Sequence, residues 1–344
     1  MKQNSGEFKI ECNSVWKIFG PSPKRILETH GRSKSRAEVQ EETGHVVAVK
    51  DVSFSVRTGE CFVVMGLSGS GKSTLVRCLT RLIAPTVGEV LLDGQDVARM
   101  SRTELQSLRR FKVAMVFQHF GLLPHRTVIE NISYGLEIRG AGRRDRTKKA
   151  AGVLDLVGLV GWGDRYPHEL SGGMQQRVGL ARAMAVDPEI LIFDEPFSAL
   201  DPLIRREMQD ELLDLQNKLN KTMVFITHDF HEAIKMGDNI AIMKDGEIVQ
   251  IGTPEDIVAK PVDEYVRDFA EDVPRYKVLT AGKVMRQRSS LEFADDRRVS
   301  KDTKLENLIN MAAGSDRPLA VVDDSGEIVG EIDREIMMRA MAAN

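Results

Sequence analysis

Short apolar runs alternate with amphipathic stretches through the middle of the chain, from about residue 46 to residue 270. Runs of strand length occupy 61–65, 190–193 and 224–227, and their continuous apolar character is typical of buried strands. The stretch 125–187 has mostly helical spacing and separates two strand-bearing parts. Strands that alternate with helices predict an α/β fold, with a largely parallel or mixed sheet covered by helices.

The N-terminal part of the chain follows a different pattern. Residues 8–19 hold two apolar segments that predict an edge strand and its continuation. Residues 20–45 are polar and charged. Within them Ser35 and Glu38 have the spacing of a capping box, and Gly44 suits a helix end. We therefore expect a short helical insertion on the surface.

The pattern changes again after residue 270, so we expect one domain over 1–270 and a second over 271–344. The second domain is predicted to be small and α+β. Its apolar positions predict a helix at 303–311, strands at 319–323 and 328–332 around a turn at 324–327, and a last helix at 334–341.

Composition excludes several classes of protein. The 344 residues carry a net charge of −3, which gives no global attraction to nucleic acid. No stretch approaches the roughly 18–20 continuous apolar residues of a membrane span, and the first residues lack the apolar core of a signal peptide. Three cysteines are too few for a disulfide framework. These features fit a reducing cytoplasm.

The segment 66–74 reads GLSGSGKST and forms a complete phosphate-binding loop. Its glycines let backbone N–H groups turn inward toward phosphate oxygens. Lys72 is expected to reach the β- and γ-phosphates, and the Ser73 hydroxyl to be a Mg²⁺ ligand. The loop joins a predicted strand to a helix N-terminus, where the helix dipole also favours anions. The candidate ATP-binding residues of this loop are Gly66, Ser68, Gly69, Ser70, Gly71, Lys72, Ser73 and Thr74.

Two other predicted strands end in polar residues that suit the same chemistry. Asp194 and Glu195 follow one strand; Asp194 can hold Mg²⁺, and Glu195 can polarise or deprotonate the water that attacks the γ-phosphate. His228 follows the next strand and can stabilise the charge that develops there. Two acids and a histidine at strand ends are often structural, so their functional interpretation depends on the phosphate loop.

Ser171, Gly172 and Gly173 open a predicted helix that runs to about residue 185. Exposed N–H groups at such a helix start form a second anion site. One nucleotide cannot easily use two such sites on one compact chain, so we infer that this site meets a nucleotide held by another copy. A helix cap without a ligand is the alternative.

Together these residues resemble the nucleotide-binding subunit of ABC transporters, over roughly residues 8–270. The resemblance implies an ABC-type P-loop ATPase domain with mixed sheets and a helical subdomain at about 125–187. The family's motifs match, in the expected order, a Walker A loop at 66–74, a Walker B strand at 190–195, a Q-loop at Gln118, a signature motif at Ser171, Gly172, Gly173 and Gln175, a D-loop at Asp201 and a switch histidine at His228. Phe19 matches the aromatic residue on which adenine stacks, and Trp16 competes for that role.

The resemblance also implies a mechanism and partners. Two copies would enclose two ATP molecules, with Mg²⁺ held by Ser73, Gln118 and Asp194 and with Glu195 and His228 as the catalytic residues. The homodimer would sit on the cytoplasmic face of the membrane against a separate permease, supplied by an extracytoplasmic solute-binding protein. The segment after Gln118, with apolar side chains such as Leu122, Leu123 and Pro124, would either form the groove for a permease helix or belong to the helical core.

The insertion at 20–45 and the segments 117–125 and 201–210 are similar to the quaternary-amine uptake subgroup. That subgroup imports glycine betaine, proline or choline. The alternatives are import of another small solute and a non-transport ABC ATPase. The C-terminal elements resemble a single CBS motif, which implies either a sensor of ionic strength or of a small ligand, or an inert dimerisation cap.

Overall fold

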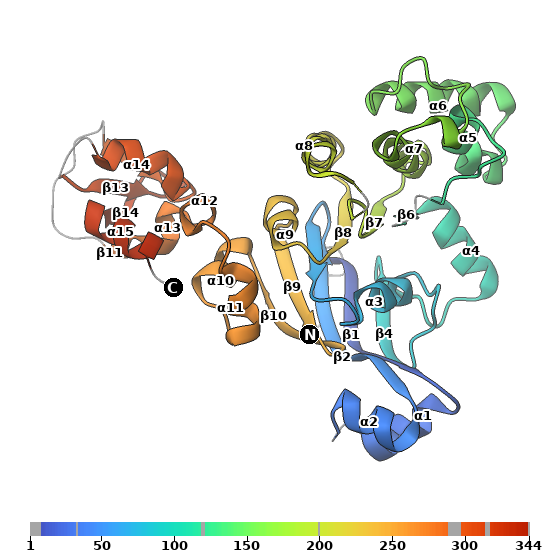
Figure 1. Cartoon of the computed structure of the whole chain (residues 1–344), viewed down its shortest axis with the longest axis horizontal. Coiled ribbons are helices and arrows are strands. Elements are labelled where there is room, and N and C mark those ends of the chain that lie inside the picture. Colours follow the sequence, from blue (N-terminus) through green and yellow to red (C-terminus); the bar gives the residue numbers. More distant parts are fainter. Residues whose placement is uncertain are drawn as a thin grey trace. The chain divides into compact units, whose positions relative to one another are not determined.

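The computed structural model describes residues 8–31, 34–117, 121–198, 200–287, 297–313 and 317–342 (Figure 1). Contacts divide the chain into two compact units, Met1–Val249 and Gln250–Asn344. The sequence predicted a boundary at residue 270, which lies within the second unit, at the end of helix α11 (Glu264–Ala270). The two units are described separately.

The first unit contains two sheets, of which the smaller is antiparallel and has the strand order β2-β1-β4-β5. Its strands are β1 (Phe8–Phe19), β2 (Val46–Arg57), β4 (Val87–Leu92) and β5 (Gln95–Asp96). The prediction of an edge strand at the start of the chain is wrong, because β1 pairs with β2 on one side and with β4 on the other. Its apolar alternation is that of an inner strand whose second partner arrives later in the chain.

The larger sheet has the strand order β10-β9-β3-β8-β7-β6. Its strands are β3 (Cys61–Met65), β6 (Val113–Val116), β7 (Ile190–Asp194), β8 (Thr222–Thr227), β9 (Asn239–Lys244) and β10 (Glu247–Gly252). The strands β9, β3, β8, β7 and β6 run parallel. Every residue of β3, β7 and β8 is buried, as their continuous apolar character predicted. Their carboxyl ends therefore meet at one edge of the sheet.

Helices and a shared core join these sheets. The ring of Phe54 on β2 stacks on that of Phe62 on β3, with 4.8 Å between centroids. The predicted helical stretch at 125–187 is confirmed, with α5, α6 and α7 packed on one another. The helices of this unit after the insertion are α3 (Lys72–Leu79), α4 (Arg102–Phe111), α5 (Val128–Ile138), α6 (Arg143–Leu156), the short 3₁₀ helix Pro167–Glu169, α7 (Gly172–Ala185), α8 (Pro202–Leu219) and α9 (Phe230–Met236).

The insertion between β1 and β2 is helical, as predicted. It contains α1 (Pro23–Ile26), a π-helical turn (Leu27–Gly31) and α2 (Arg36–Thr43). Ser35 and Glu38 form the expected capping box, and Gly44 ends α2 in the left-handed conformation at φ 70°. An apolar cluster fixes the insertion to the smaller sheet; its buried members are Trp16, Ile18, Leu27, Val39 and Val47.

The second unit holds a four-stranded sheet in the order β11-β14-β13-β12. The helix–strand–turn–strand–helix order predicted from the sequence is present, and Asp323 Oδ1 accepts hydrogen bonds from the backbone of Ser325 and Glu327 in the turn. The elements are α10 (Pro254–Ala259), α11, α12 (Arg275–Val278), α13 (Ala281–Val284), β11 (Arg286–Gln287), β12 (Arg298–Ser300), α14 (Leu305–Ala313), β13 (Leu319–Val322), β14 (Ile328–Ile332) and α15 (Arg334–Ala342).

None of the helices in the described ranges combines the length and the apolar character that a membrane crossing requires.

Candidate functional site

The loop between β3 and α3 has a backbone that only glycine permits at two positions. Gly66 and Gly71 have φ values of +147° and +106°. A Cβ atom would lie 2.2 Å from the Met243 carbonyl oxygen at Gly66 and 2.1 Å from the Ala48 carbonyl oxygen at Gly71. Both positions thus need glycine for conformation and for space. The result is the open cradle that the sequence motif predicted.

The carbonyl groups of this loop are engaged by the protein. Lys72 Nζ donates to the carbonyl oxygens of Gly66 and Leu67, at 2.8 and 3.1 Å. The backbone N–H of Gly246, in the turn between β9 and β10, donates to the carbonyl oxygen of Ser70 at 2.9 Å. With these carbonyls turned into the protein, the loop can present N–H groups on its other side, where phosphate oxygens would lie.

The side chains of the loop differ in their accessibility. Ser68 is exposed and Ser70 is 5% exposed, so Ser68 carries the hydroxyl that a ligand could reach. Lys72 is only 4% exposed. Burial lowers the pKa of the Lys72 ammonium, and the carboxylates of Glu195 and Asp194 oppose that shift. Thr74, in the first turn of α3, is partly buried.

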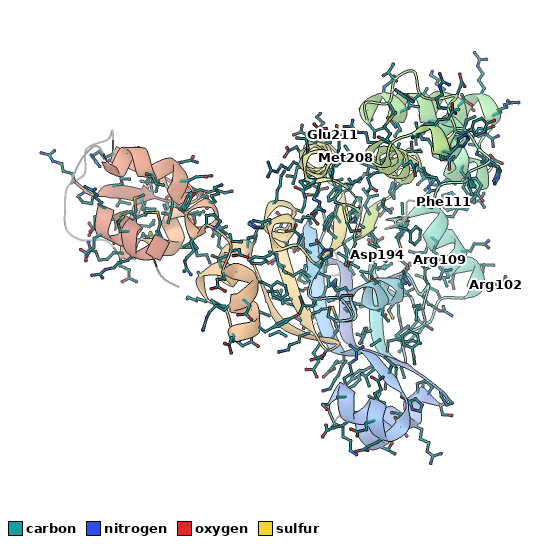
Figure 2. All side chains as sticks on the ribbon, in the orientation of Figure 1. Arg102, Arg109, Phe111, Asp194, Met208 and Glu211 are labelled. Atoms are coloured by element: carbon teal, nitrogen blue, oxygen red, sulfur yellow. The ribbon has the colours of Figure 1, made fainter. Side chains whose placement is uncertain are left out.

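Ser73 and Asp194 meet at the edge of the larger sheet. Ser73 Oγ donates to Asp194 Oδ1 at 2.8 Å, and Arg77 Nη2 lies 3.4 Å from Asp194 Oδ2. Asp194 ends β7 and is 4% exposed, near the centre of the first unit (Figure 2). Ser73 and Asp194 were identified from the sequence, but Arg77 was not. An arginine within a helix belongs to no motif that would indicate a functional role.

This pair fits a Mg²⁺ ion. A hydroxyl and a buried carboxylate are the oxygen donors that Mg²⁺ prefers, and the ion commonly completes its shell with phosphate oxygens and water. The described residues hold no cluster of three or more His, Cys, Asp or Glu side chains that would make a closed metal site. Gln118, the third predicted ligand, lies outside the described residues, as do His119 and Phe120.

Glu195 and His228 lie beside the phosphate loop. Glu195 adopts the left-handed conformation at φ +49°, which is uncommon for a residue other than glycine. Its Oε2 lies 3.1 Å from His228 Nδ1, and its Oε1 lies 3.8 Å from Lys72 Nζ. The strand ends bring these residues together because β7 pairs with β8 and β8 with β3. The predicted grouping of Lys72, Glu195 and His228 is therefore present.

A buried polar network that the sequence analysis missed supports the loop of His228. Thr227 Oγ1 donates to Glu232 Oε2 at 2.6 Å and accepts from the backbone of Asp229 at 3.0 Å. Burial raises the pKa of Glu232. Arg205 of α8 lies 3.4 Å from the Asp229 carboxylate and donates to the carbonyl oxygen of Leu200 at 3.2 Å. These contacts connect the start of α8 with the histidine loop.

The predicted signature residues begin α7, beside α5 and α6 and apart from α3 (Figure 1). Ser171 caps the helix, since its Oγ accepts from the backbone of Met174 at 3.3 Å. Ser171 and Gly172 are exposed, whereas a Cβ atom on Gly173 would lie 2.6 Å from Ile204 of α8. The Gln175 amide donates to backbone carbonyls of the preceding turn. The structure thus does not bring these residues to the phosphate loop of the same chain.

The predicted D-loop residue Asp201 caps α8, and its Oδ1 accepts from the backbone of Leu203 and Ile204, at 3.1 Å each. Just before it, Ser198 Oγ donates to the carbonyl oxygen of Glu195 at 3.0 Å. Ala199 lies outside the described residues. The segment therefore connects the candidate catalytic carboxylate to a capped helix within a few residues.

Two aromatic residues of β1 compete for a role in stacking on adenine. Trp16 is 4% exposed and belongs to the apolar cluster under the insertion. Phe19 is 40% exposed, and the Lys17 ammonium lies 4.9 Å from the centre of its ring. Only Phe19 therefore offers a ring to a ligand.

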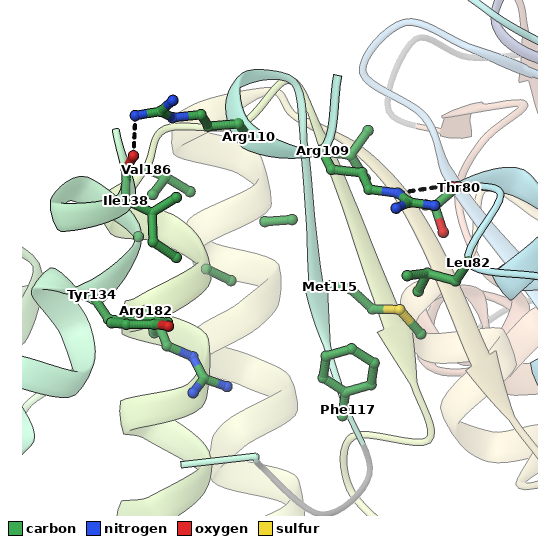
Figure 3. Close-up of a pocket in the computed structure, with 14 residues that line it drawn as sticks. Thr80, Leu82, Arg109, Arg110, Met115, Phe117, Tyr134, Ile138, Arg182 and Val186 are labelled. Atoms are coloured by element: carbon green, nitrogen blue, oxygen red, sulfur yellow. Dashed lines mark hydrogen bonds between the residues drawn. The ribbon is translucent and has the colours of Figure 1, made fainter. Parts of the chain in front are cut away.

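An apolar groove of about 270 Å³ lies between α4, β6, α5 and α7. Figure 3 shows Leu82, Met115 and Phe117 on one side and Tyr134, Ile138 and Val186 on the other. Arg109 and Arg110 lie at one end, where they donate to the carbonyl oxygens of Thr80 and Ile138. Leu122, Leu123 and Pro124 are not among its lining residues. Leu123 instead exchanges backbone hydrogen bonds with the Asn131 side chain at the start of α5.

Comparison with known proteins gives matches over most of the chain. Residues 49–198 match the family described as ABC transporter. The chain is 52% identical over 308 residues to the glycine betaine transport ATP-binding protein OpuAA of Bacillus subtilis (strain 168), covering 90% of this chain and 73% of that protein. It is 51% identical over 324 residues to the trimethylamine N-oxide transport system ATP-binding protein TmoW of Pelagibacter ubique (strain HTCC1062), covering 94% of each.

A solved structure matches the fold of most of the chain. It is a dimeric, post-hydrolysis state of the ATP-binding cassette MJ0796 bound to ADP and Pi. The match has a TM-score of 0.60 and 32% sequence identity, and it covers 71% of this chain and 98% of that one.

Proposed function

Because this chain belongs to the family of ABC transporter ATP-binding subunits, we propose that it is the ATPase of an importer that takes up a small N-methylated osmolyte through a separate membrane permease. The family predicted from the motifs is confirmed by these relatives. One observation carries the proposal: Lys72, Glu195 and His228 meet beside the Ser73–Asp194 pair at the end of the phosphate loop.

The geometry supports hydrolysis of a nucleoside triphosphate. Lys72 is the cation at the loop, and charge-assisted hydrogen bonds from it to phosphate oxygens would replace those to the loop carbonyls. Glu195 is placed to accept a proton from an attacking water, and His228 holds the Glu195 carboxylate from the side away from Lys72. A bound Mg²⁺ ion would be held by Ser73 and Asp194 and would neutralise charge on the phosphates.

We infer that the working form is a homodimer. The start of α7 is exposed at Ser171 and Gly172, and α7 lies apart from the phosphate loop of its own chain. A second copy, placed head to tail, would bring its Ser171, Gly172 and Gly173 to the nucleotide held on the first. ATP would then favour the closed dimer, and hydrolysis would release it.

The permease is proposed to dock in the groove between α4 and α5. Its walls combine exposed apolar side chains, such as Leu82 and Ile138, with arginines at one end. A short amphipathic helix suits such a surface. Docking there would place the subunit on the cytoplasmic face of the membrane, while a solute-binding protein would deliver the solute on the other face.

The solute class is inferred from the relatives. One is named for glycine betaine and the other for trimethylamine N-oxide, and both solutes carry three methyl groups on one nitrogen. Choline carries the same trimethylated nitrogen and belongs to this class, whereas proline has no N-methyl group and is the competing solute. We propose no contact between the solute and this chain, because the solute would cross within the permease.

The role of the second unit stays a prediction. Its sheet and helices have the order expected for a single CBS-like motif. We favour a cap that supports dimerisation over a sensor of ionic strength or of a small ligand. A truncated chain ending at residue 274 would separate these roles, since only a sensor predicts that its loss changes the salt dependence of transport.

Reconstitution tests the proposed function. The chain, its permease and the solute-binding protein are placed in vesicles with ATP, and uptake of radiolabelled glycine betaine, trimethylamine N-oxide, choline and proline is measured. The proposal predicts ATP-dependent uptake of at least one N-methylated solute and none with Glu195→Gln. ATP hydrolysis with uptake of proline alone, or of none of the four, would keep the ATPase and overturn the solute class.

A further inference from the structure

The insertion between β1 and β2 touches the phosphate loop. Arg36 Nη1, at the start of α2, donates a hydrogen bond of 2.7 Å to the carbonyl oxygen of Gly69. Arg36 is half-buried, and it lies 33 residues before Gly69 in the chain.

The insertion holds Arg36 firmly in place. Its backbone is fixed because the preceding Ser35 caps α2 in a complete capping box with Glu38. Val39 of α2 is fully buried in the cluster that also contains Trp16. The arginine is therefore presented from a packed helix and not from a loose loop.

The base of the insertion is closed as well. His45 Nε2 lies 2.7 Å from the carbonyl oxygen of Pro21, which joins the two ends of the insertion. The His45 ring packs so closely on Gly20 that a Cβ atom there would lie 2.2 Å from it. The segment that follows Phe19 is thus fixed at both of its ends.

A cation in the first turn of a helix is unfavourable for the helix itself, because the helix dipole is positive at that end. Arg36 therefore gains nothing from its position in α2. The Gly69 carbonyl supplies a compensating interaction. Lys50, which lines the same surface pocket as Arg36, has its own partner, since its Nζ lies 2.5 Å from Glu247 Oε1.

The carbonyl group of Gly69 is oriented by a hydrogen bond and not by packing of the described side chains. Gly69 has φ +80°, and a Cβ atom built on it would meet none of the described residues within 4 Å. Nothing in the described part of the chain therefore packs on that side of Gly69, and its carbonyl group is held by the hydrogen bond from Arg36. The next carbonyl, of Ser70, already accepts from Gly246. Arg36 and Gly246 together hold two consecutive carbonyl groups away from the side of the loop where phosphates would bind.

We propose that Arg36 is a positioning residue for the nucleotide phosphates, so that the insertion forms part of the ATP site. It fixes the Gly69–Ser70 peptide and thereby preorganises the phosphate loop before the nucleotide binds. The guanidinium also adds positive charge beside a polyanion. The proposal rests on the loop being the nucleotide site and is independent of the solute that is transported.

Nucleotide affinity and backbone exchange test the proposal on the full chain. The dissociation constants of ADP and ATP are measured by calorimetry for the wild type, Arg36→Ala, Arg36→Lys and Arg25→Ala. Arg25 is an exposed arginine of α1 in the same insertion and serves as the matched control. Loss of one partly exposed charge-assisted hydrogen bond should weaken both nucleotides about five-fold in Arg36→Ala. Arg36→Lys should recover part of that loss, and Arg25→Ala should match the wild type.

Two further readouts separate positioning from general damage. Amide hydrogen exchange within 66–74 should be faster in nucleotide-free Arg36→Ala, with the thermal unfolding midpoint unchanged. The KM for ATP should rise while kcat stays near that of the wild type, because the lost interaction holds substrate and transition state alike.

An Arg36→Ala chain with wild-type affinity and wild-type exchange would overturn the role of Arg36 alone. A wild-type chain that binds neither ADP nor ATP would instead overturn the nucleotide site. If Arg36→Ala is unstable, Arg36→Lys decides. Weaker nucleotide binding and faster exchange within 66–74 than in the wild type and in Arg25→Ala support the proposal, and wild-type values of both contradict it.

Discussion

Glu195 and His228 are held 3.1 Å apart, Oε2 to Nδ1, by the ends of two neighbouring parallel strands. A single glutamate or histidine at the end of a strand does not by itself indicate a catalytic site. Together they place a carboxylate between an imidazole and the buried ammonium of Lys72, where one oxygen faces each partner.

We predict that Glu195→Gln keeps nucleotide binding and nearly abolishes turnover. General-base catalysis typically contributes about 10²- to 10⁴-fold, so kcat should fall by that range. Because the bound ATP is not cleaved, the closed dimer should also accumulate. Size-exclusion chromatography with light scattering would detect it. Glu207→Gln, at an exposed position of α8, is the control and should behave as the wild type. Normal hydrolysis by Glu195→Gln would remove Glu195 from its role.

Lys72→Ala should weaken binding itself. The buried ammonium is the cation that the phosphates would meet, and hydrogen bonds to charged groups contribute about 1.5–3 kcal/mol each. Affinity for ATP should therefore fall at least about ten-fold. Lys218→Ala, at an exposed position near the end of α8, leaves the loop intact. Calorimetry on both variants makes the comparison, and equal affinities would contradict the assignment of Lys72.

Two glycine substitutions should have opposite effects. Gly71→Ala places a methyl group 2.1 Å from a backbone oxygen in a left-handed conformation, so the loop must distort and nucleotide binding should be lost. Gly152→Ala, in the exposed middle of α6 with open space around it, should stabilise the fold by about 0.5–1 kcal/mol. The unfolding midpoint and the nucleotide affinity are measured for both variants. Loss of binding in Gly71→Ala would show that glycine is required at position 71, and a higher midpoint in Gly152→Ala would show that glycine is only tolerated at position 152.

Glu232 gives a pH-dependent prediction. Its pKa is raised by burial, so the native state favours the neutral form and stability falls as pH rises above the ordinary value for glutamate toward the raised pKa. Glu232→Gln keeps an acceptor for Thr227 and removes the buried charge. As pH rises above the ordinary pKa of glutamate, the wild type should lose stability relative to the variant. Unfolding midpoints of both proteins measured at about pH 5 and at about pH 8 make the comparison. A difference that is constant with pH would show that Glu232 is not the titrating group.

Docking of a permease can be tested without disturbing the ATP site. Ile138→Glu puts a charge into the apolar groove, whereas Leu156→Glu puts one at an exposed position of α6 outside it. We expect Ile138→Glu to keep the basal ATPase activity and to lose co-purification with the permease. Leu156→Glu should keep both. Retention of the permease by Ile138→Glu would place the docking surface elsewhere.

Much of the site could be predicted because its parts lie at the ends of continuous apolar strands. Parallel strands place their carboxyl ends at one edge, so Lys72, Asp194, Glu195 and His228 were expected to meet. The position of β1 was mispredicted because the partner on its second side, β4, comes from much later in the chain. Apolar alternation reports which face is buried but not how many neighbours a strand has.

Other contacts left no trace in the sequence pattern. The hydrogen bond from Arg36 to Gly69 joins two polar segments, and polar surface positions do not indicate which segments touch. The network of Arg205, Asp229 and Glu232 depends on how α8 packs near α9. The hydrogen bonds between Leu123 and the Asn131 side chain likewise join segments whose pairing the pattern does not indicate. Such pairings follow from tertiary packing, which periodicity alone does not encode.

The hydrogen bonds from Lys72 to its own loop also affect what happens when product leaves. The carbonyl oxygens of Gly66 and Leu67 accept the hydrogen bonds that Lys72 would otherwise give to phosphate oxygens. A triphosphate that arrives or leaves would therefore exchange one set of acceptors for another, and the buried ammonium would keep a partner throughout.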